Sequence, residues 1–149
     1  MSGLPTVSIS HIGICTSDVE HSLRFYIEAL GFVLERSIDE IGPPYDSLME
    51  LPGVRCRVHY VKCGAVTIEL IGYPGAGVTG SAQRRAMNQL GFTHMTLVVD
   101  DVNAAVERVV RFGGHVHRET AIDSPFGPMV FCTDPDGARI ELVQSAGQA

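Results

Sequence analysis

The segment His11-Ile-Gly-Ile-Cys-Thr-Ser-Asp18-Val19 recurs later in the chain as His94-Met-Thr-Leu-Val-Val-Asp-Asp101-Val102. The two histidines are 83 residues apart (94 − 11), and the aspartates, the valines and a later pair of glycines, Gly31 and Gly114, keep the same offset. Matches at a constant offset are the signature of a duplicated unit, here of about 70 residues. The chain is therefore expected to consist of two homologous modules.

A second repeat marks the end of each module. Ile68-Glu69-Leu70 recurs as Ile140-Glu141-Leu142 at an offset of 72 residues (141 − 69). The first copy thus carries 11 extra residues (83 − 72), which fall within Asp39 to Gly53. Insertions of this size usually decorate a surface or cover a site.

Each copy has the same pattern of secondary structure. An apolar strand leads to an aspartate that can cap a helix, apolar residues then recur at helical spacing, and glycine ends the helix. Three further strands follow, and Cys63-Gly64 and Asp134-Pro-Asp-Gly137 supply turns between the last two. The predicted strands are Ser8–Cys15, Phe32–Arg36, Val54–Val61 and Val66–Gly72, and then Thr93–Val99, His115–Arg118, Met129–Cys132 and Arg139–Gln144.

The predicted fold class is therefore α+β, with two tandem βαβββ modules in one domain that spans residues 1–149. Module 1 covers about residues 7–74, a glycine-rich linker about 75–90, and module 2 about 91–145. A short helix is expected over Ala82 to Leu90.

Composition limits the possible partners. The net charge is −6 and the sequence pI is about 5.4, which argues against nucleic acid and anionic membranes because both require a basic surface. No apolar run approaches the length of about 20 residues that spans a membrane, and no signal peptide is recognisable. We expect a cytoplasmic protein.

Four polar residues interrupt apolar strands at equivalent places in the two modules: His11, Glu69, His94 and Glu141. Side chains alternate along a strand, so these four point away from the face that packs on the helices. A carboxylate between two aliphatic residues is costly unless it is paired or binds a metal. Any one of them alone would be read as an edge-strand group in solvent, but all four in register predict a His2Glu2 site for one divalent ion, Zn, Ni, Co, Mn or Fe.

The sequence resembles the vicinal-oxygen-chelate superfamily over nearly the whole chain. The resemblance lies in the paired modules, in the histidines that begin them and in the ending Asp-Pro-Asp-Gly-x-x-Ile-Glu-Leu. The resemblance implies the fold of glyoxalases, bleomycin resistance proteins and dioxygenases, and metal ligands at His11, Glu69, His94 and Glu141. It points to a lyase or isomerase, similar to glyoxalase I or an acyl-CoA epimerase, which transfers a proton next to a carbonyl. Glu141 and Glu69 are the candidate catalytic bases, and the sequence does not rank them.

Candidate substrate contacts lie in the first module. Arg55, Arg57 and His59 alternate with apolar residues and either face the cavity, where they would meet an anionic substrate, or lie exposed on an edge strand. Glu50, in the insertion, is a candidate second base, although a solvated loop residue is the favoured reading.

Two other functions remain open. One is an Fe(II)-dependent ring-cleaving dioxygenase of the extradiol type, which the resemblance associates with only one glutamate ligand. The other is a metal-free small-molecule-binding or resistance protein, which would not need four aligned ligands. The expected partner is a small carbonyl or thioester substrate. We also expect a homodimer, and the sequence leaves open whether the metal site forms within one chain or across two.

Overall fold

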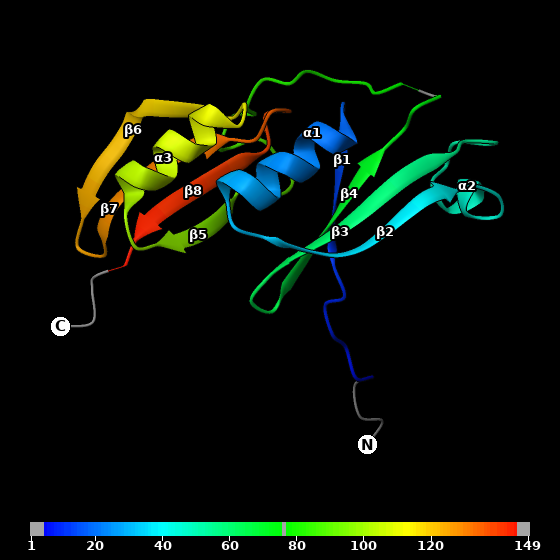
Figure 1. Ribbon diagram of the computed structural model, residues 1–149, viewed down its shortest axis with the longest axis horizontal. Helices are drawn as coiled ribbons and strands as arrows, with labels where there is room; N and C mark the ends of the chain where they lie inside the picture. The colour runs from blue at the N-terminus through cyan, green and yellow to red at the C-terminus, as the bar shows by residue number, and fades with distance from the viewer. Residues whose placement is uncertain (1–4, 76, 146–149) are drawn as a thin grey trace.

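The strands form two sheets with the same internal order, one from each copy of the repeat (Figure 1). The computed structural model describes residues 5–75 and 77–145. The first sheet has the order β1 (Ile12–Thr16), β4 (Val66–Gly72), β3 (Cys56–Cys63), β2 (Val33–Ile41). The second has the order β5 (Met95–Val99), β8 (Arg139–Gln144), β7 (Gly127–Thr133), β6 (His115–Ser124). In both, the first strand runs parallel to the last and the other pairs are antiparallel. This confirms the predicted pair of βαβββ modules.

The helices begin as the sequence predicts, each after a capping aspartate. The carboxylate of Asp18 accepts a hydrogen bond from a first-turn N–H of α1 (Val19–Arg24), and Asp101 does the same for α3 (Val102–Arg111). After α1 the chain continues as a π-helix, η1 (Phe25–Ala29), which the sequence did not predict. Gly31 then adopts a positive φ of 76°, a conformation that glycine tolerates without strain.

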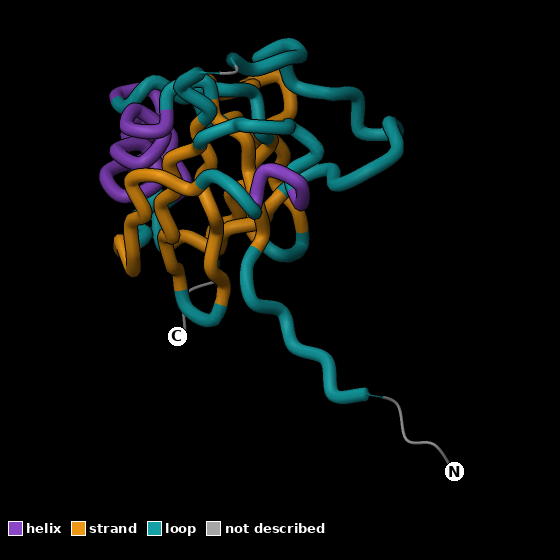
Figure 2. Tube along the Cα trace, turned by 90° about the vertical axis from the view of Figure 1, so that its right-hand side faces the viewer, coloured by secondary structure: helices purple, strands orange, loops and turns teal. Residues whose placement is uncertain are grey.

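All of these helices lie on the same side of the strands, so each sheet keeps its other face free of them (Figure 2). A single apolar core joins the modules on the helix side, because η1 packs on α3. Its largest fully buried side chains are Tyr26, Phe25, Ile68, Leu70, Ile140 and Leu142. Leu70 and Leu142 alternate with Glu69 and Glu141, so the two glutamates lie on the opposite faces.

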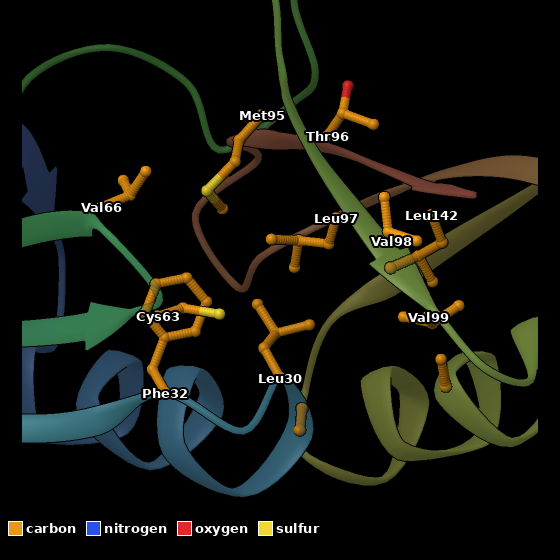
Figure 3. A pocket seen from close by; sticks show the side chains of 12 residues that line it. Leu30, Phe32, Cys63, Val66, Met95, Thr96, Leu97, Val98, Val99 and Leu142 are labelled. Carbon is orange, nitrogen blue, oxygen red and sulfur yellow. The ribbon is translucent and has the colours of Figure 1, made fainter. Parts of the chain in front are cut away.

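An apolar cavity of about 300 Å³ lies at the seam between the modules. Leu30 and Phe32 from the first module face Met95 and Leu97 of β5 across it (Figure 3). Its lining includes none of the four predicted metal ligands and only one ionisable side chain, Cys63. A cavity of this kind can bind apolar groups but offers no acid–base chemistry.

The turn Asp134-Pro-Asp-Gly137 also connects the modules. Asp134 is buried, and its carboxylate accepts a hydrogen bond from the Tyr26 hydroxyl at 3.1 Å and from the N–H groups of Asp136 and Ala138. Asp136 in turn accepts hydrogen bonds from the N–H and the hydroxyl of Ser17. Burial raises the pKa of Asp134 to about 6, against the lowering effect of these hydrogen bonds.

Several regions differ from the prediction, among them the strand expected over His115–Arg118, which continues to Ser124 as β6. In the insertion, β2 extends to Ile41 and is followed by a short helix, α2 (Tyr45–Leu48). Met49 reaches β3, where its sulfur lies 3.7 Å from Sγ of Cys56, so the insertion covers one end of the first sheet. The helix expected over Ala82 to Leu90 is wrong, because this segment forms turns and bends. Within the described residues, no helix is long and apolar enough to cross a membrane.

Candidate metal centre

In the first module, His11 and Glu69 lie together on the side of the sheet opposite α1 and η1. His11 immediately precedes β1, whose parallel pairing with β4 puts Gly13 opposite Glu69. Nε2 of His11 is 3.2 Å from Oε2 of Glu69. The other glutamate oxygen, Oε1, accepts a hydrogen bond of 2.6 Å from the Tyr60 hydroxyl. Both oxygens of Glu69 therefore have a partner.

In the second module, His94 and Glu141 form the equivalent pair. His94 precedes β5, and Thr96 lies opposite Glu141 in the parallel pairing with β8. Nε2 of His94 is 3.7 Å from Oε2 of Glu141, which also accepts a hydrogen bond of 2.7 Å from the Thr96 hydroxyl. Oε1 of Glu141 has no hydrogen-bond partner in the described part of the chain.

A hydroxyl group orients each histidine ring. Oγ of Ser10 lies 3.0 Å from Nδ1 of His11, and Oγ1 of Thr93 lies 2.9 Å from Nδ1 of His94. The two hydroxyl residues are themselves 83 positions apart (93 − 10). A hydrogen bond at one ring nitrogen fixes the ring and leaves the other nitrogen for a metal. In both modules the nitrogen left over is the Nε2 that faces glutamate.

An aromatic ring and an arginine lie beside each histidine–glutamate pair, and each pair with these neighbours is called a half-site below. The ring of Tyr60 meets His11 edge-on at a centroid distance of 5.4 Å, and the guanidinium of Arg36 lies 4.3 Å from the Tyr60 centroid. Burial and the hydrogen bond to Glu69 raise the pKa of Tyr60, while Arg36 opposes the shift. The raised pKa keeps the phenol protonated as a donor. In the second module, Phe131 meets His94 at 5.4 Å, and Arg139 lies 5.0 Å from the Phe131 centroid.

The donor spacing fits metal coordination. Two ligand atoms about 2.1 Å from one ion are about 3.0 Å apart at octahedral angles and about 3.4 Å apart at tetrahedral angles. The observed nitrogen–oxygen separations, 3.2 Å in the first pair and 3.7 Å in the second, lie near this range. Imidazole nitrogen with carboxylate oxygen suits Zn, Ni, Co, Mn or Fe(II). Each pair could thus supply two adjacent ligands to one ion.

Within one chain the two pairs do not meet. Among residues 5–75 and 77–145, no three histidine, cysteine, aspartate or glutamate side chains are placed to hold an ion together. Each module instead presents its pair on its own sheet, with side-chain exposures of 37% for His11 and 28% for His94. The sequence left open whether the site forms within one chain or across two. The described residues of a single chain do not form a complete site.

The predicted basic contacts lie elsewhere. Arg57 and His59 face the helix side, where both contact Glu20 of α1, at 3.2 Å and 3.3 Å. The expected alternation is inverted, because Tyr60 rather than His59 shares a face with Glu69. Arg55 pairs with Glu40 at the surface. Glu50 lies in an exposed turn with a positive φ of 57°. This geometry gives none of these four a contact with the histidine–glutamate pairs.

Sequence reasoning missed the residues that contact these histidines and glutamates: Ser10, Tyr60, Thr93 and Thr96. Ser10 and Thr93 could have been found, since they precede the two histidines at the same offset of 83. Tyr60 and Thr96 carried no comparable signal, because the positions equivalent to them are occupied by Phe131 and Gly13.

Comparison with known proteins identifies the family of this chain. A model of the Glyoxalase/Bleomycin resistance protein/Dioxygenase superfamily matches residues 8–142. The chain belongs to this superfamily. Lactoylglutathione lyase of Neisseria meningitidis serogroup B is 30% identical over 149 residues, covering 90% of the chain and 88% of the relative. A probable lactoylglutathione lyase of Synechocystis is 28% identical, covering 93% and 95%. These relatives support a lyase member of the superfamily.

Solved structures show the same fold. A glyoxalase family protein of Bacillus cereus matches with a TM-score of 0.85 at 16% identity, covering 99% of both chains. The trypanothione-dependent glyoxalase I of Leishmania major matches with a TM-score of 0.65 at 22% identity, covering 93% of this chain and 87% of the other. At these identities the similarity concerns the fold alone.

Proposed function

We propose that this chain is a divalent-metal-dependent lyase of the glyoxalase I type, which acts on the hemithioacetal of a 2-oxoaldehyde and glutathione. The observation that carries the proposal is the repeated half-site, in which a hydroxyl residue orients a histidine so that Nε2 faces a glutamate. A metal-free binding protein does not need this geometry twice. The lactoylglutathione lyase names of the curated relatives support the choice of thiol and of reaction.

The complete site is proposed to form between two copies of the chain. His11 and Glu69 of one copy would join His94 and Glu141 of the other, which gives the His2Glu2 set that the described residues of one chain do not assemble. Exposed apolar residues in the segments around the two histidines support a second copy, because a protein contact would remove their side chains from water. They include Val7, Ile9, Phe92 and Val98, which are between 70% and 88% exposed.

The residues suggest a division of roles in the proton transfer. A bound divalent ion would polarise the substrate carbonyl and stabilise negative charge on its oxygen. Glu141 is the proposed base, since its Oε1 is not engaged by another described residue and can accept the proton at the carbon next to the carbonyl. Returning that proton to the neighbouring carbon completes the isomerisation. Glu69, with both oxygens occupied, is proposed to serve as a ligand.

The first test is activity. Methylglyoxal and glutathione should be converted to the lactoyl thioester by protein loaded with Ni, Co, Zn or Mn, and a chelator should abolish the conversion. Elemental analysis should find about one ion for each complete ligand set. In heavy water, any proton exchange with solvent should place deuterium on the carbon that receives the proton. Oxygen uptake with catechols, without thioester formation, would instead establish the dioxygenase alternative.

The second test asks whether the site is shared. One variant carries His11→Ala and Glu69→Gln, and the other carries His94→Ala and Glu141→Gln. Each should be inactive alone. Co-expressed chains should regain activity if the site lies between copies, because a mixed dimer contains one intact ligand set. Mixed dimers that form but stay inactive would contradict the shared site.

A further inference from the structure

A second cavity, of about 450 Å³, lies at one end of the second sheet. The start of β6, the end of β7 and the segment before β5 surround it. Its lining residues are Ala82, Gln83, Arg84, His115, His117 and Thr133. In contrast with the apolar cavity at the module seam, this one is lined mainly by hydrogen-bonding and cationic side chains.

His117 is the unusual member of this cavity. Its side chain is only 12% exposed, and its Nε2 is buried without a hydrogen-bond partner among the described residues. Nδ1 is 3.8 Å from Glu119, too far for a hydrogen bond. A buried polar atom without a partner is costly, and natural sites of this kind usually receive a ligand or water.

The surroundings of His117 are positive, although the protein carries a net charge of −6. Burial lowers the pKa of His117, and the neighbouring Arg84, His115 and Arg139 lower it further, against the opposing effect of Glu119. The His115 ring lies 4.8 Å from that of His117. One carboxylate, Glu119, is present, and it accepts a hydrogen bond of 2.6 Å from Arg84. Cations therefore outnumber acids around the cavity.

The cavity shares a sheet face with the second half-site. Residues opposite each other in antiparallel strands point to the same side, and His117 lies opposite Phe131, which lies opposite Glu141. Two strand spacings, about 10 Å, separate His117 from Glu141 across the sheet. One ligand of moderate size could therefore touch both.

The wall of the cavity that comes from the inter-module segment is held in place. A Cβ atom at Gly137 would lie 2.2 Å from the carbonyl oxygen of Ala82, so the segment packs directly on the Asp134–Gly137 turn. Arg139 also donates a hydrogen bond of 2.5 Å to the carbonyl of Arg85. Arg84 is thus presented from a fixed backbone.

We propose that this cavity is an anion-binding subsite, in which Arg84, His115 and His117 hold a carboxylate or phosphate group of a ligand whose reacting end lies at the His94–Glu141 pair. Guanidinium and imidazole N–H groups are suitable donors for such oxygens. Anion binding itself does not depend on the proposed function, whereas the position of the reacting end rests on it.

The test uses metal-depleted protein and two probes, inorganic phosphate and succinate, titrated separately while the histidine ring protons are followed by NMR. His115→Gln and His117→Gln assign the two signals. We expect both signals to shift on titration, and the probe with the higher affinity identifies the anion class. Arg84→Gln should weaken binding about tenfold. Glu119→Gln should strengthen it, because the carboxylate that competes for Arg84 is gone.

Arg111→Gln, on the exposed surface of α3, is the matched control and should leave binding unchanged. If neither probe shifts the two signals, or if Arg84→Gln and Glu119→Gln have no effect, the subsite is wrong. With the hemithioacetal, Arg84→Gln should raise KM about tenfold and leave kcat nearly unchanged. Anion binding without lyase activity would contradict the proposed function but not the subsite. Lyase activity without anion binding would contradict the subsite but not the proposed function.

Discussion

The two histidine–glutamate pairs share their framework and differ in one hydrogen bond. In the first module the hydroxyl that holds Glu69 comes from β3, on Tyr60; in the second the hydroxyl that holds Glu141 comes from β5, on Thr96. The position equivalent to Tyr60 is Phe131, and the position equivalent to Thr96 is Gly13. After duplication, each module therefore supplies its glutamate with one hydroxyl donor, but from a different strand.

This difference leaves the glutamates in different states. The Tyr60 bond engages the oxygen of Glu69 that His11 does not face, so both oxygens are occupied. Thr96 bonds the same oxygen of Glu141 that His94 faces, which leaves the other oxygen available. A carboxylate needs an available oxygen to take up a proton. On this geometry we propose Glu141 rather than Glu69 as the base, a choice that the sequence left open.

The largest expected effect concerns this ranking. Glu141→Gln should lower kcat about 10³-fold, within the range for loss of a general base, because an amide cannot accept the proton. Glu69→Gln should lower it only about tenfold, since the amide oxygen can still bind a metal. Steady-state kinetics with elemental analysis of both variants checks this. A larger kcat loss in Glu69→Gln, at equal metal content, would reverse the roles.

The histidines should behave alike, in contrast with the glutamates. His11→Ala and His94→Ala should each weaken metal affinity by at least about a hundredfold, since each removes an Nε2 donor. Competition with a chelator measures the affinity.

His21→Ala is the control, because His21 contacts the carbonyl of Phe112 at 3.2 Å and faces neither pair. Loss of metal in this variant as severe as in His11→Ala would show that the first half-site is assigned to the wrong residues.

A smaller effect tests whether the two hydroxyl donors are interchangeable. Tyr60→Phe should weaken metal affinity or lower kcat about tenfold, because Glu69 loses a charge-assisted hydrogen bond. Adding Gly13→Thr copies the second module into the first and should restore part of the loss. A Cβ at Gly13 would meet only ordinary contacts, 3.6 Å from Glu69 and from Ile71. If the double variant is no better than Tyr60→Phe, the two modules do not use their donors equivalently.

The fold and the sheet faces on which Glu69 and Glu141 lie could be predicted, because both follow from patterns that the sequence itself carries. The offset of 83 residues exposed the duplication, Asp18 and Asp101 marked the helix starts, and alternation around Glu69 and Glu141 gave the face on which they lie. Each of these signals is read from the sequence without knowing which strands pair.

The remaining features depend on register and on neighbours distant in sequence. Whether Tyr60 or His59 shares a face with Glu69 is decided by the pairing of β3 with β4, and a shift of one residue inverts every side chain. The separation of the two half-sites depends on how the modules pack along η1 and α3. The cavity around His117 likewise needs the path of residues 82–85, which sequence alone assigned to a helix.

The turns between the last two strands provide the smallest contrast. In the first module the turn is the short Cys63-Gly64 segment, whereas the turn of the second module buries the side chain of Asp134. Because the folded-state pKa of Asp134 is raised from 3.8 to about 6, the folded protein binds a proton more tightly than the unfolded chain. Its contribution to stability is therefore fully present below the unfolded pKa and is lost as pH rises through about 6. Through this group, the free energy of unfolding should fall by about 1 kcal/mol between pH 5 and pH 7.5. In Asp134→Asn, whose side chain does not titrate, this component should vanish, so the difference between wild type and variant should shrink by that amount. Denaturant unfolding of both proteins at each pH measures it. A difference that grows with pH would mean that the hydrogen bonds to the carboxylate outweigh its burial.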